Sequence, residues 1–383
     1  MIACAVGAGA LLSGCYDDAV VAVAAPMEKR LAVTGSGSAL ERVTSDPLQE
    51  VHPAISPDGK TLLFQSRVYE GGTLQQATLV GVDPSSRAQR TLYTSTNSMS
   101  DHPAWLPDQS SFIYKSNSPG NWSLVRALAA APNAAINVIA AGEIAPDAAW
   151  PSVAPDGKRV VFSARIRGVE TVAMISLDGS RFTLLGEGTM PSWGPDGTSI
   201  AFARRVGSRM HLFTINPDTG GGLVQLTSGD FDHETPTWSP DGQFIVFAKG
   251  DLPENQAVRN LYILRKNGTE LTKLTDGTTS LGSPCWSRDG WIYFSSDQSG
   301  NYDIWRLKPI GQYGNLRPAS VAPSAAAAGP VQAALPEATP IKAPPPPEPV
   351  VGGCQKDTDC KGDRVCERGA CVSPAPAKKP GGR

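Results

Sequence analysis

Six copies of one hairpin pattern run through most of this chain, and they restrict its fold more than any other feature. The clearest copy is Pro236-Thr-Trp-Ser-Pro-Asp-Gly-Gln-Phe-Ile-Val-Phe247, in which one apolar strand enters a Ser-Pro-Asp-Gly turn and a second strand leaves it. Proline presets φ at the second turn position, aspartate caps the turn, and glycine takes the left-handed conformation that follows. The other copies are Pro53–Gly59, Pro103–Gln109, Pro151–Gly157, Pro191–Gly197 and Pro284–Gly290.

The spacing of these turns predicts the architecture. The turn aspartates Asp58, Asp108, Asp156, Asp196, Asp241 and Asp289 are 50, 48, 40, 45 and 48 residues apart. A period of about 40 to 50 residues built from short strands is typical of four-stranded propeller blades. We therefore expect an all-β fold, a six-bladed β-propeller over residues 39–310.

The last blade lacks an outer strand of its own. Ala39–Thr44 has the sequence of such a strand but precedes the first blade. We expect it to pair with residues near 302–307 and to close the ring, which removes two exposed sheet edges. Gln109 stands where the other turns have glycine, and Arg288 stands where they have proline.

The amino terminus has the features of an export signal. Residues 1–14 are apolar and small and run into Cys15, and Leu12-Ser-Gly-Cys15 resembles the bacterial lipobox. That length suits a signal peptide and is too short for a membrane-spanning helix. The resemblance implies lipidation of Cys15, with residues 15–38 as a tether. No Lys or Arg precedes the apolar run, so either the start lies upstream of Met1 or the signal is atypical.

The carboxyl-terminal part changes composition. Residues 311–352 are rich in proline and alanine and should form a disordered linker. Residues 353–373 hold Cys354, Cys360, Cys366 and Cys371, which in an exported chain indicate a small module with two disulfides. Residues 374–383 form a disordered tail in this prediction. The connectivity of the cysteines stays open, and Cys285, in an inner strand, is expected to be a buried free thiol.

The repeats also carry a family resemblance. Copies of Pro-x-Trp-Ser-Pro-Asp-Gly, each followed by a strand ending in Phe-x-Ser or Phe-x-Ala, resemble the TolB-type propeller repeat over residues 39–308. The resemblance implies a propeller of the bacterial envelope that acts through protein contacts. TolB itself carries an α/β domain before its propeller; here the repeats begin soon after Cys15, so the chain resembles a TolB-like propeller and not TolB itself.

Candidate binding residues lie just ahead of the inner strands, where propellers usually bind ligands at the channel mouth. They are His52, Asp101, His102, Trp150, Asp232, His233 and Glu234. Loops expected at the same face add arginines, among them Arg67, Arg165 and Arg204, which could bind an anionic glycan or an acidic peptide. The competing interpretation of each arginine is a salt bridge to a neighbouring acidic loop.

We interpret the chain as an envelope lipoprotein whose propeller binds a protein or peptide, with the outer membrane favoured because Tyr16, not Asp, follows Cys15. A net charge of −2 gives no basic field for nucleic acid, and we expect a monomer without catalytic residues, cofactor or metal. One alternative is a metal-dependent enzyme acting on carbohydrate through His52, His102 and His233, as some TolB-like propellers cleave pectic oligosaccharides. A second alternative is a structural spacer without a specific ligand.

Overall fold

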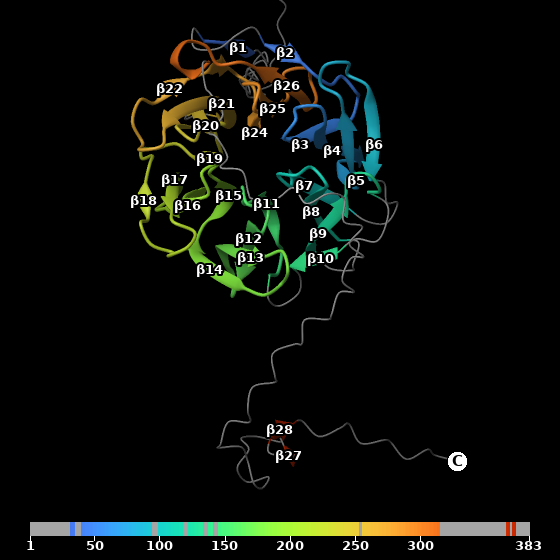
Figure 1. Cartoon of the computed structure of the whole chain (residues 1–383), viewed down its shortest axis with the longest axis vertical. Coiled ribbons are helices and arrows are strands. Elements are labelled where there is room, and N and C mark those ends of the chain that lie inside the picture. Colours follow the sequence, from blue (N-terminus) through green and yellow to red (C-terminus); the bar gives the residue numbers. More distant parts are fainter. Residues whose placement is uncertain are drawn as a thin grey trace, which may run out of the picture. The chain divides into compact units, whose positions relative to one another are not determined.

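The computed structural model describes residues 31–34, 40–93, 99–117, 122–132, 137–140, 145–252, 255–314, 365–367 and 370–372. The chain divides into two compact units, Met1–Pro330 and Val331–Arg383. The first unit holds six four-stranded antiparallel sheets arranged in a ring (Figure 1). This confirms the six-bladed propeller predicted from the turn repeats.

Each of the first five blades takes its four strands from consecutive sequence. Blade one is β3 (Gln49–Ile55), β4 (Leu62–Glu70), β5 (Thr73–Val82) and β6 (Gln89–Tyr93). Blade two is β7 (Ser100–Trp105), β8 (Ser111–Ser116), β9 (Ser123–Leu128) and β10 (Asn137–Ala140). Blade three is β11 (Ala149–Val153), β12 (Arg159–Ile166), β13 (Val169–Ser176) and β14 (Phe182–Glu187). Blade four is β15 (Thr189–Trp193), β16 (Ile200–Val206), β17 (Arg209–Ile215) and β18 (Val224–Gln225). Blade five is β19 (His233–Trp238), β20 (Phe244–Leu252), β21 (Asn255–Arg265) and β22 (Thr272–Lys273).

Blade six is completed from the other end of the propeller, as predicted. It contains β24 (Leu281–Trp286), β25 (Ile292–Ser296), β26 (Asp303–Leu307) and, outermost, β2 (Glu41–Arg42). Glu41 lies opposite Arg306 and Arg42 opposite Trp305. The closure therefore joins residues more than 260 positions apart, and it leaves blade six with the same number of strands as the others.

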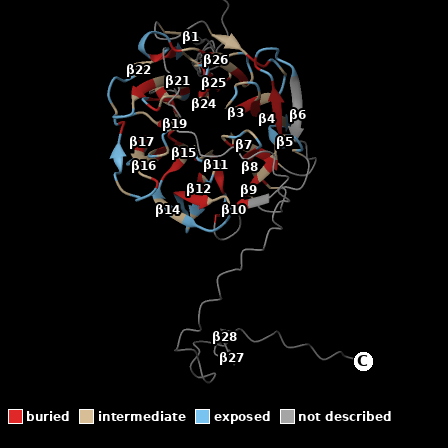
Figure 2. Ribbon diagram, viewed as in Figure 1, coloured by how far each residue is buried: buried red, intermediate tan, exposed pale blue. Residues whose placement is uncertain are grey.

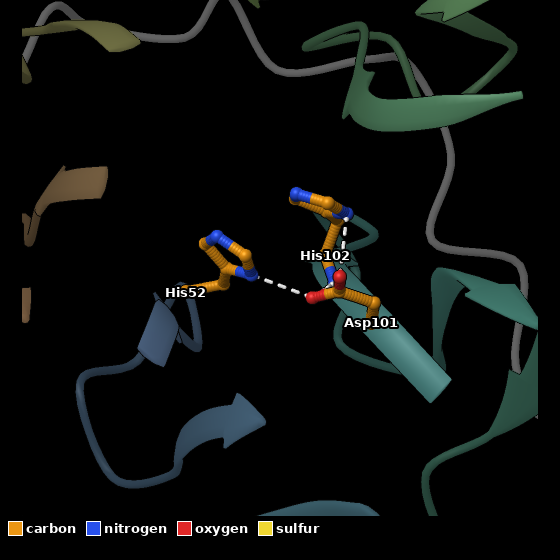
Figure 3. A group of neighbouring side chains, drawn as sticks. All are labelled: His52, Asp101 and His102. Carbon is orange, nitrogen blue, oxygen red and sulfur yellow. Dashed lines mark hydrogen bonds and ion pairs between the residues drawn. The ribbon is translucent and has the colours of Figure 1, made fainter. Parts of the chain in front are cut away.

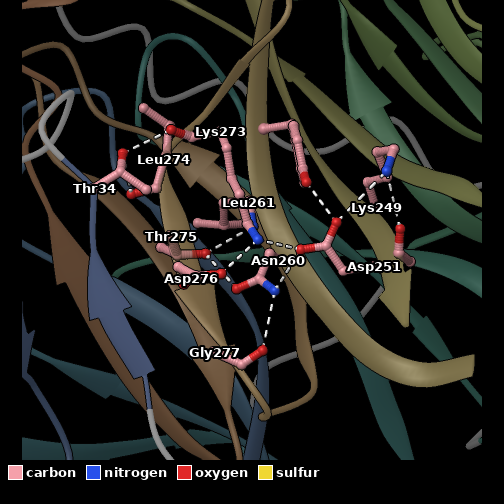
Figure 4. A network of polar contacts seen from close by, with 12 residues as sticks. Thr34, Lys249, Asp251, Asn260, Leu261, Lys273, Leu274, Thr275, Asp276 and Gly277 are labelled. Carbon is pink, nitrogen blue, oxygen red and sulfur yellow. Dashed lines mark hydrogen bonds and ion pairs between the residues drawn. The ribbon is translucent and has the colours of Figure 1, made fainter. Parts of the chain in front are cut away.

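A second amino-terminal strand was not anticipated. β1 (Leu31–Val33), inside the stretch expected to be a tether, pairs with β23 (Thr275–Gly277). Thr34 donates its hydroxyl to the carbonyl of Lys273 at 2.7 Å, and the Lys273 ammonium contacts the carboxylate of Asp276 at 2.5 Å. Figure 4 shows this contact beside the Asp251 carboxylate, which accepts a hydrogen bond from the Asn260 amide at 3.0 Å. The segment ahead of the ring is thus attached to blade five as well as to blade six.

The turns follow the chemistry of the repeat. In five of the six copies the turn aspartate accepts a hydrogen bond from the backbone N–H two residues later, for example Lys60 N–H to Asp58 at 3.0 Å. Gln109 adopts φ of +62° at the position that glycine holds elsewhere. The substituted turn still forms, because the other residues of the hairpin fix its geometry.

Apolar side chains of adjacent blades pack against one another, and Figure 2 shows in red that many strands of the blades are buried. One such cluster joins blades three and four through Val161, Trp193 and Phe202. Tryptophans of the repeat also link neighbouring blades by hydrogen bonds. Trp105 Nε1 donates to the Ala54 carbonyl of blade one at 3.1 Å, and Trp238 Nε1 donates to the Ser192 carbonyl of blade four at 3.1 Å.

Trp105→Phe is expected to lower the free energy of unfolding by about 1 kcal/mol more than Trp286→Phe does. Both indoles occupy the same repeat position, but the buried Nε1 of Trp286 has no partner among the described residues. Both substitutions remove the same volume, so their difference isolates the hydrogen bond. Equilibrium denaturation in urea measures it, and equal losses in the two variants would contradict the assignment.

The propeller extends slightly beyond residue 310. A short 3₁₀ helix, η1 (Gly311–Tyr313), buries the Tyr313 ring against blade five, where its hydroxyl lies 2.9 Å from Thr272 Oγ1. This turn was expected to belong to the linker. In the second unit, β27 (Val365–Glu367) pairs with β28 (Ala370–Val372), and the register places Cys366 opposite Cys371. The predicted signal peptide with Cys15, most of the predicted linker, Cys354, Cys360 and the predicted tail at 374–383 lie outside the described residues.

No helix in the described part of the chain is long and apolar enough to cross a membrane.

Candidate functional site

The residue before the proline of each inner strand has the same unusual backbone. These six residues have φ between +48° and +54°, a left-handed conformation that non-glycine residues rarely adopt. The register of each inner strand shifts across this position, as in a β-bulge. All six line one cavity of about 280 Å³. We call them the channel ring: His52, His102, Trp150, Met190, Thr235 and Ser283.

The bulge explains why these side chains meet. A left-handed residue in a strand redirects its side chain and disrupts the ladder locally. Because every blade repeats the distortion at its innermost strand, the six side chains converge on the centre of the propeller. Such conformations cost on the order of 1 kcal/mol each, and their presence in all six blades indicates that the surrounding fold imposes them.

Three side chains of the channel ring, those of His52, His102 and Trp150, form an aromatic group. The imidazoles of His52 and His102 stack with centroids 4.1 Å apart. The Trp150 indole lies 3.9 Å from the centroid of His102 and 5.0 Å from that of His52. This places polar nitrogens and a large apolar face at the same point of the channel.

Asp101 holds the two imidazoles in place (Figure 3). His52 Nδ1 lies 2.5 Å from Asp101 Oδ1, and His102 Nδ1 lies 3.3 Å from Oδ2. Burial alone would raise the pKa of Asp101, but His102, His52 and Arg67 outweigh it and hold this pKa well below its usual value. Burial lowers the pKa of His102 well below that of free histidine, and the Asp101 carboxylate opposes this shift without overcoming it. Both ring nitrogens of His102 are buried without a hydrogen-bond partner among the described residues.

A second cavity of about 290 Å³ opens from the same ring. It adds Arg67, Glu234 and Arg259, and it shares with the first cavity every member of the channel ring except His102. We call this second cavity the channel mouth. Arg259 Nε donates to Glu234 Oε2 at 2.8 Å.

The structure brings together five of the expected site residues, His52, Asp101, His102, Trp150 and Glu234. His233 is not among them: it is 1% exposed, lies between blades four and five, and has its ring 5.3 Å from that of His211. Burial lowers the pKa of His233 to about 4. Asp232 accepts the backbone N–H of Met210 at 2.8 Å and lines neither cavity.

Of the expected arginines, Arg67 lines the second cavity, whereas Arg165 and Arg204 line neither cavity. Arg165 is 54% exposed and lies within 4.0 Å of Asp147 and of Glu170. Arg204 lies 3.8 Å from Glu187 and over the Phe213 ring. Both therefore fit the salt-bridge interpretation.

Sequence reasoning missed three members of the channel ring, Met190, Thr235 and Ser283, together with Arg259 at the mouth. The signal for the ring was present, because each of these residues directly precedes the proline of its repeat. Counting every candidate from that proline would have selected the ring and would have left out His233, which lies three residues before Pro236.

Comparison with known proteins gives consistent results. The family model of the TolB beta propeller domain matches residues 31–240, more than half of the chain. Among solved structures, a protein of Agrobacterium tumefaciens assigned as TolB matches at 17% identity and a TM-score of 0.55, covering 74% of this chain and 100% of that one.

Enzymes share the fold. An oligogalacturonate lyase of Vibrio parahaemolyticus matches at 13% identity and a TM-score of 0.50, covering 75% of this chain and 98% of its own. A gluconolactonase of Xanthomonas campestris matches at 12% identity and a TM-score of 0.53, covering 74% and 95%. At these identities the matches show the fold alone, which proteins with and without catalytic activity use.

Proposed function

The chain belongs to the TolB beta propeller domain family, and from that premise we propose that it is a scaffold of the bacterial envelope that binds a protein or peptide at the channel mouth. The observation that carries the proposal is the aromatic group of Trp150, His52 and His102, which lines the first cavity of about 280 Å³. Two of these residues, His52 and Trp150, also line the channel mouth. Large rings that combine an apolar face with a polar edge are favoured where proteins bind partners. The neighbouring structures of TolB proteins support this class of function.

The size of the mouth limits what can enter it. A cavity of about 290 Å³ admits one or two side chains or the end of a chain, and not a folded domain. The partner would therefore insert a short segment, while its remaining surface contacts the rim.

Photo-crosslinking in cells tests the proposal. A benzophenone amino acid at Met190, in the channel ring, is expected to capture one dominant partner, whereas the same group at Lys60, in an exposed turn, is not. Adding Trp150→Ala to the Met190 variant should reduce capture at least about tenfold, because the apolar anchor is lost. Equal capture from both positions would contradict binding at the mouth, and no capture would favour the spacer.

A second candidate function is a metal-dependent enzyme that acts on a carbohydrate. One nitrogen or oxygen from each of His52, Asp101 and His102 lies within 4.8 Å of the others, which fits a divalent ion. When bound, the ion would supply a Lewis acid, with the two imidazoles as ligands and Asp101 fixing their orientation. Metal analysis of the purified protein separates the two functions: a stoichiometric ion that is lost in His102→Ala would favour the enzyme.

Envelope anchoring completes the proposal. Lipidation of Cys15, favouring the outer membrane, would leave 15 residues before β1 begins at Leu31, a reach of roughly 50 Å. The cysteines of the carboxyl-terminal module would form disulfides in that compartment. Incorporation of labelled fatty acid into the wild type but not into Cys15→Ser, with fractionation of the membranes, tests the anchor.

A further inference from the structure

Two arginines from different blades line the channel mouth. Arg67 comes from β4 of blade one, and Arg259 comes from β21 of blade five. Their side chains are 24% and 26% exposed, so both are largely enclosed by the walls of the cavity. Neither belongs to the channel ring, and the proposed aromatic anchor does not use them.

Each guanidinium is fixed through its Nε edge. Arg67 Nε donates to Gln65 Oε1 at 2.5 Å, and the Gln65 amide in turn donates to the Ser100 carbonyl at 2.8 Å. Arg259 Nε donates to Glu234 Oε2 at 2.8 Å. A planar group held at one edge directs its remaining donors in a set direction, and so less entropy is lost when these donors bind an acceptor.

The Nη groups of Arg67 and Arg259, unlike their Nε atoms, are not held by hydrogen bonds to neighbouring side chains in the described part of the chain. Arg67 Nη2 lies 3.8 Å from Asp101 Oδ2, which is too long for a hydrogen bond. Within the described ranges, the Nη groups of Arg67 and Arg259 make no hydrogen bond. Four strong donor groups on two cationic side chains therefore border one cavity.

The acidic groups of the mouth are already occupied. Asp101 is engaged by the imidazoles of His52 and His102, and Glu234 accepts from Arg259 Nε. The donors that remain are cationic, and Thr235 contributes a buried hydroxyl without a partner among the described residues. The groups that remain at the mouth are hydrogen-bond donors, most of them positively charged. The mouth therefore favours an anionic group that accepts hydrogen bonds.

We infer that Arg67 and Arg259 bind one carboxylate of the inserted peptide, either an acidic side chain or the terminal carboxylate. A carboxylate offers about four lone-pair positions on two oxygens, which matches two guanidinium edges. This inference rests on the proposed peptide-binding function and specifies its ligand. The apolar part of the same segment would contact Trp150 and Met190, which line the same cavity.

Matched peptides test the carboxylate. Acetyl-Ala-Glu-Ala-amide and acetyl-Ala-Gln-Ala-amide have the same shape and differ only in that charge. Titration is followed on the labelled methyl group of Met190, with the full-length protein at physiological salt. The glutamate peptide is expected to bind at least about tenfold more tightly than the glutamine peptide.

Variants of Arg67 and Arg259 test this pair of arginines, which we call the clamp. Arg67→Gln and Arg259→Gln should each weaken the glutamate peptide at least about tenfold, and Arg259→Lys should recover only part of the loss because it lacks the fork. Arg165→Gln and Arg204→Gln, which lie outside the cavity, serve as controls and should bind as the wild type does. Circular dichroism verifies that every variant is folded.

The outcomes separate the clamp from the proposed function. Equal binding of the two peptides, equal losses in the control variants, or no shift with either peptide would overturn the clamp. Galacturonate binding that depends on Arg67 and Arg259, without peptide binding, would overturn the peptide as occupant. The crosslinking at Met190 and Lys60 measures partner binding by itself, so the scaffold can stand where the clamp fails.

Discussion

Deleting residues 40–45 is expected to lower the melting temperature of the propeller by about 10–20 °C, or to leave the chain insoluble. The deletion removes β2, the Val43 side chain in the core between blades one and six, and the ion pairs from Glu41 to Arg306 and from Arg42 to Asp303. The deletion loses the burial of Val43 and several hydrogen bonds, and it deprives Asp303 of one partner. Together these losses lower the free energy of unfolding by about 5 kcal/mol or more.

The loss has a structural cause beyond the sum of its contacts. Without β2, β26 becomes an exposed edge with unpaired backbone groups, which favours aggregation. Val43→Ala is a milder variant in case the deletion does not fold, and it should cost about 2 kcal/mol. Deletion of residues 353–383, in the second unit, is the control and should leave the propeller transition unchanged. Unchanged melting after loss of residues 40–45 would show that β2 is not needed for closure.

Glu50→Gln is expected to stabilise the protein at pH 8 and to remove much of the pH dependence of its stability. The Glu50 side chain is fully buried beside the same seam, and burial raises its pKa to about 8, with Asp46 and Asp303 adding to the shift. Thr44 and Arg42 act in the opposite direction.

The direction of the pH dependence follows from how many protons the folded and unfolded states bind. An unfolded Glu50 releases its proton near pH 4.5, whereas the folded protein keeps it until about pH 8. Between these values the folded state binds more protons, so its stability falls as the pH rises. The contribution of Glu50 at pH 8 is smaller than at pH 4 by about 4 kcal/mol.

Urea denaturation at several pH values measures the effect. Glu50→Gln keeps the shape of the side chain and a group that can hydrogen-bond Thr44, but it cannot ionise. Glu270→Gln, at an exposed carboxylate paired with Arg265, is the control and should keep the slope of the wild type. A wild-type stability that does not fall between pH 5 and pH 8 would contradict the assignment of the proton to Glu50.

The repeats made the fold predictable, because their information is local. Each Ser-Pro-Asp-Gly turn specifies a hairpin within a few residues, and six of them in phase leave little choice of architecture. The closing strand was also predictable, since Ala39–Thr44 fills a gap in the repeat. β1 was not, because its three residues pair with a segment about 240 positions away and follow no repeat.

The site was predictable only in part, because side-chain direction depends on a backbone distortion. Along a regular strand, His233 and Thr235 would point to the same face. The register shift between Glu234 and Thr237 breaks that alternation, so Thr235 lines the channel while His233 is buried between blades. Arg259 was missed for a different reason: its strand follows a loop whose length varies between blades, so no repeat position marks it.

The shared conformation before each proline has a consequence for how such a protein can diverge. The six positions accept histidine, tryptophan, methionine, threonine and serine on nearly the same backbone, with φ within a few degrees. At each position the blade sets the backbone conformation, and the residue there can be substituted without a change at the other five. Proteins with this fold can therefore change their ligand specificity through single substitutions in the channel ring. Neither the hairpin turns nor the pairing of β2 with β26 has to change at the same time.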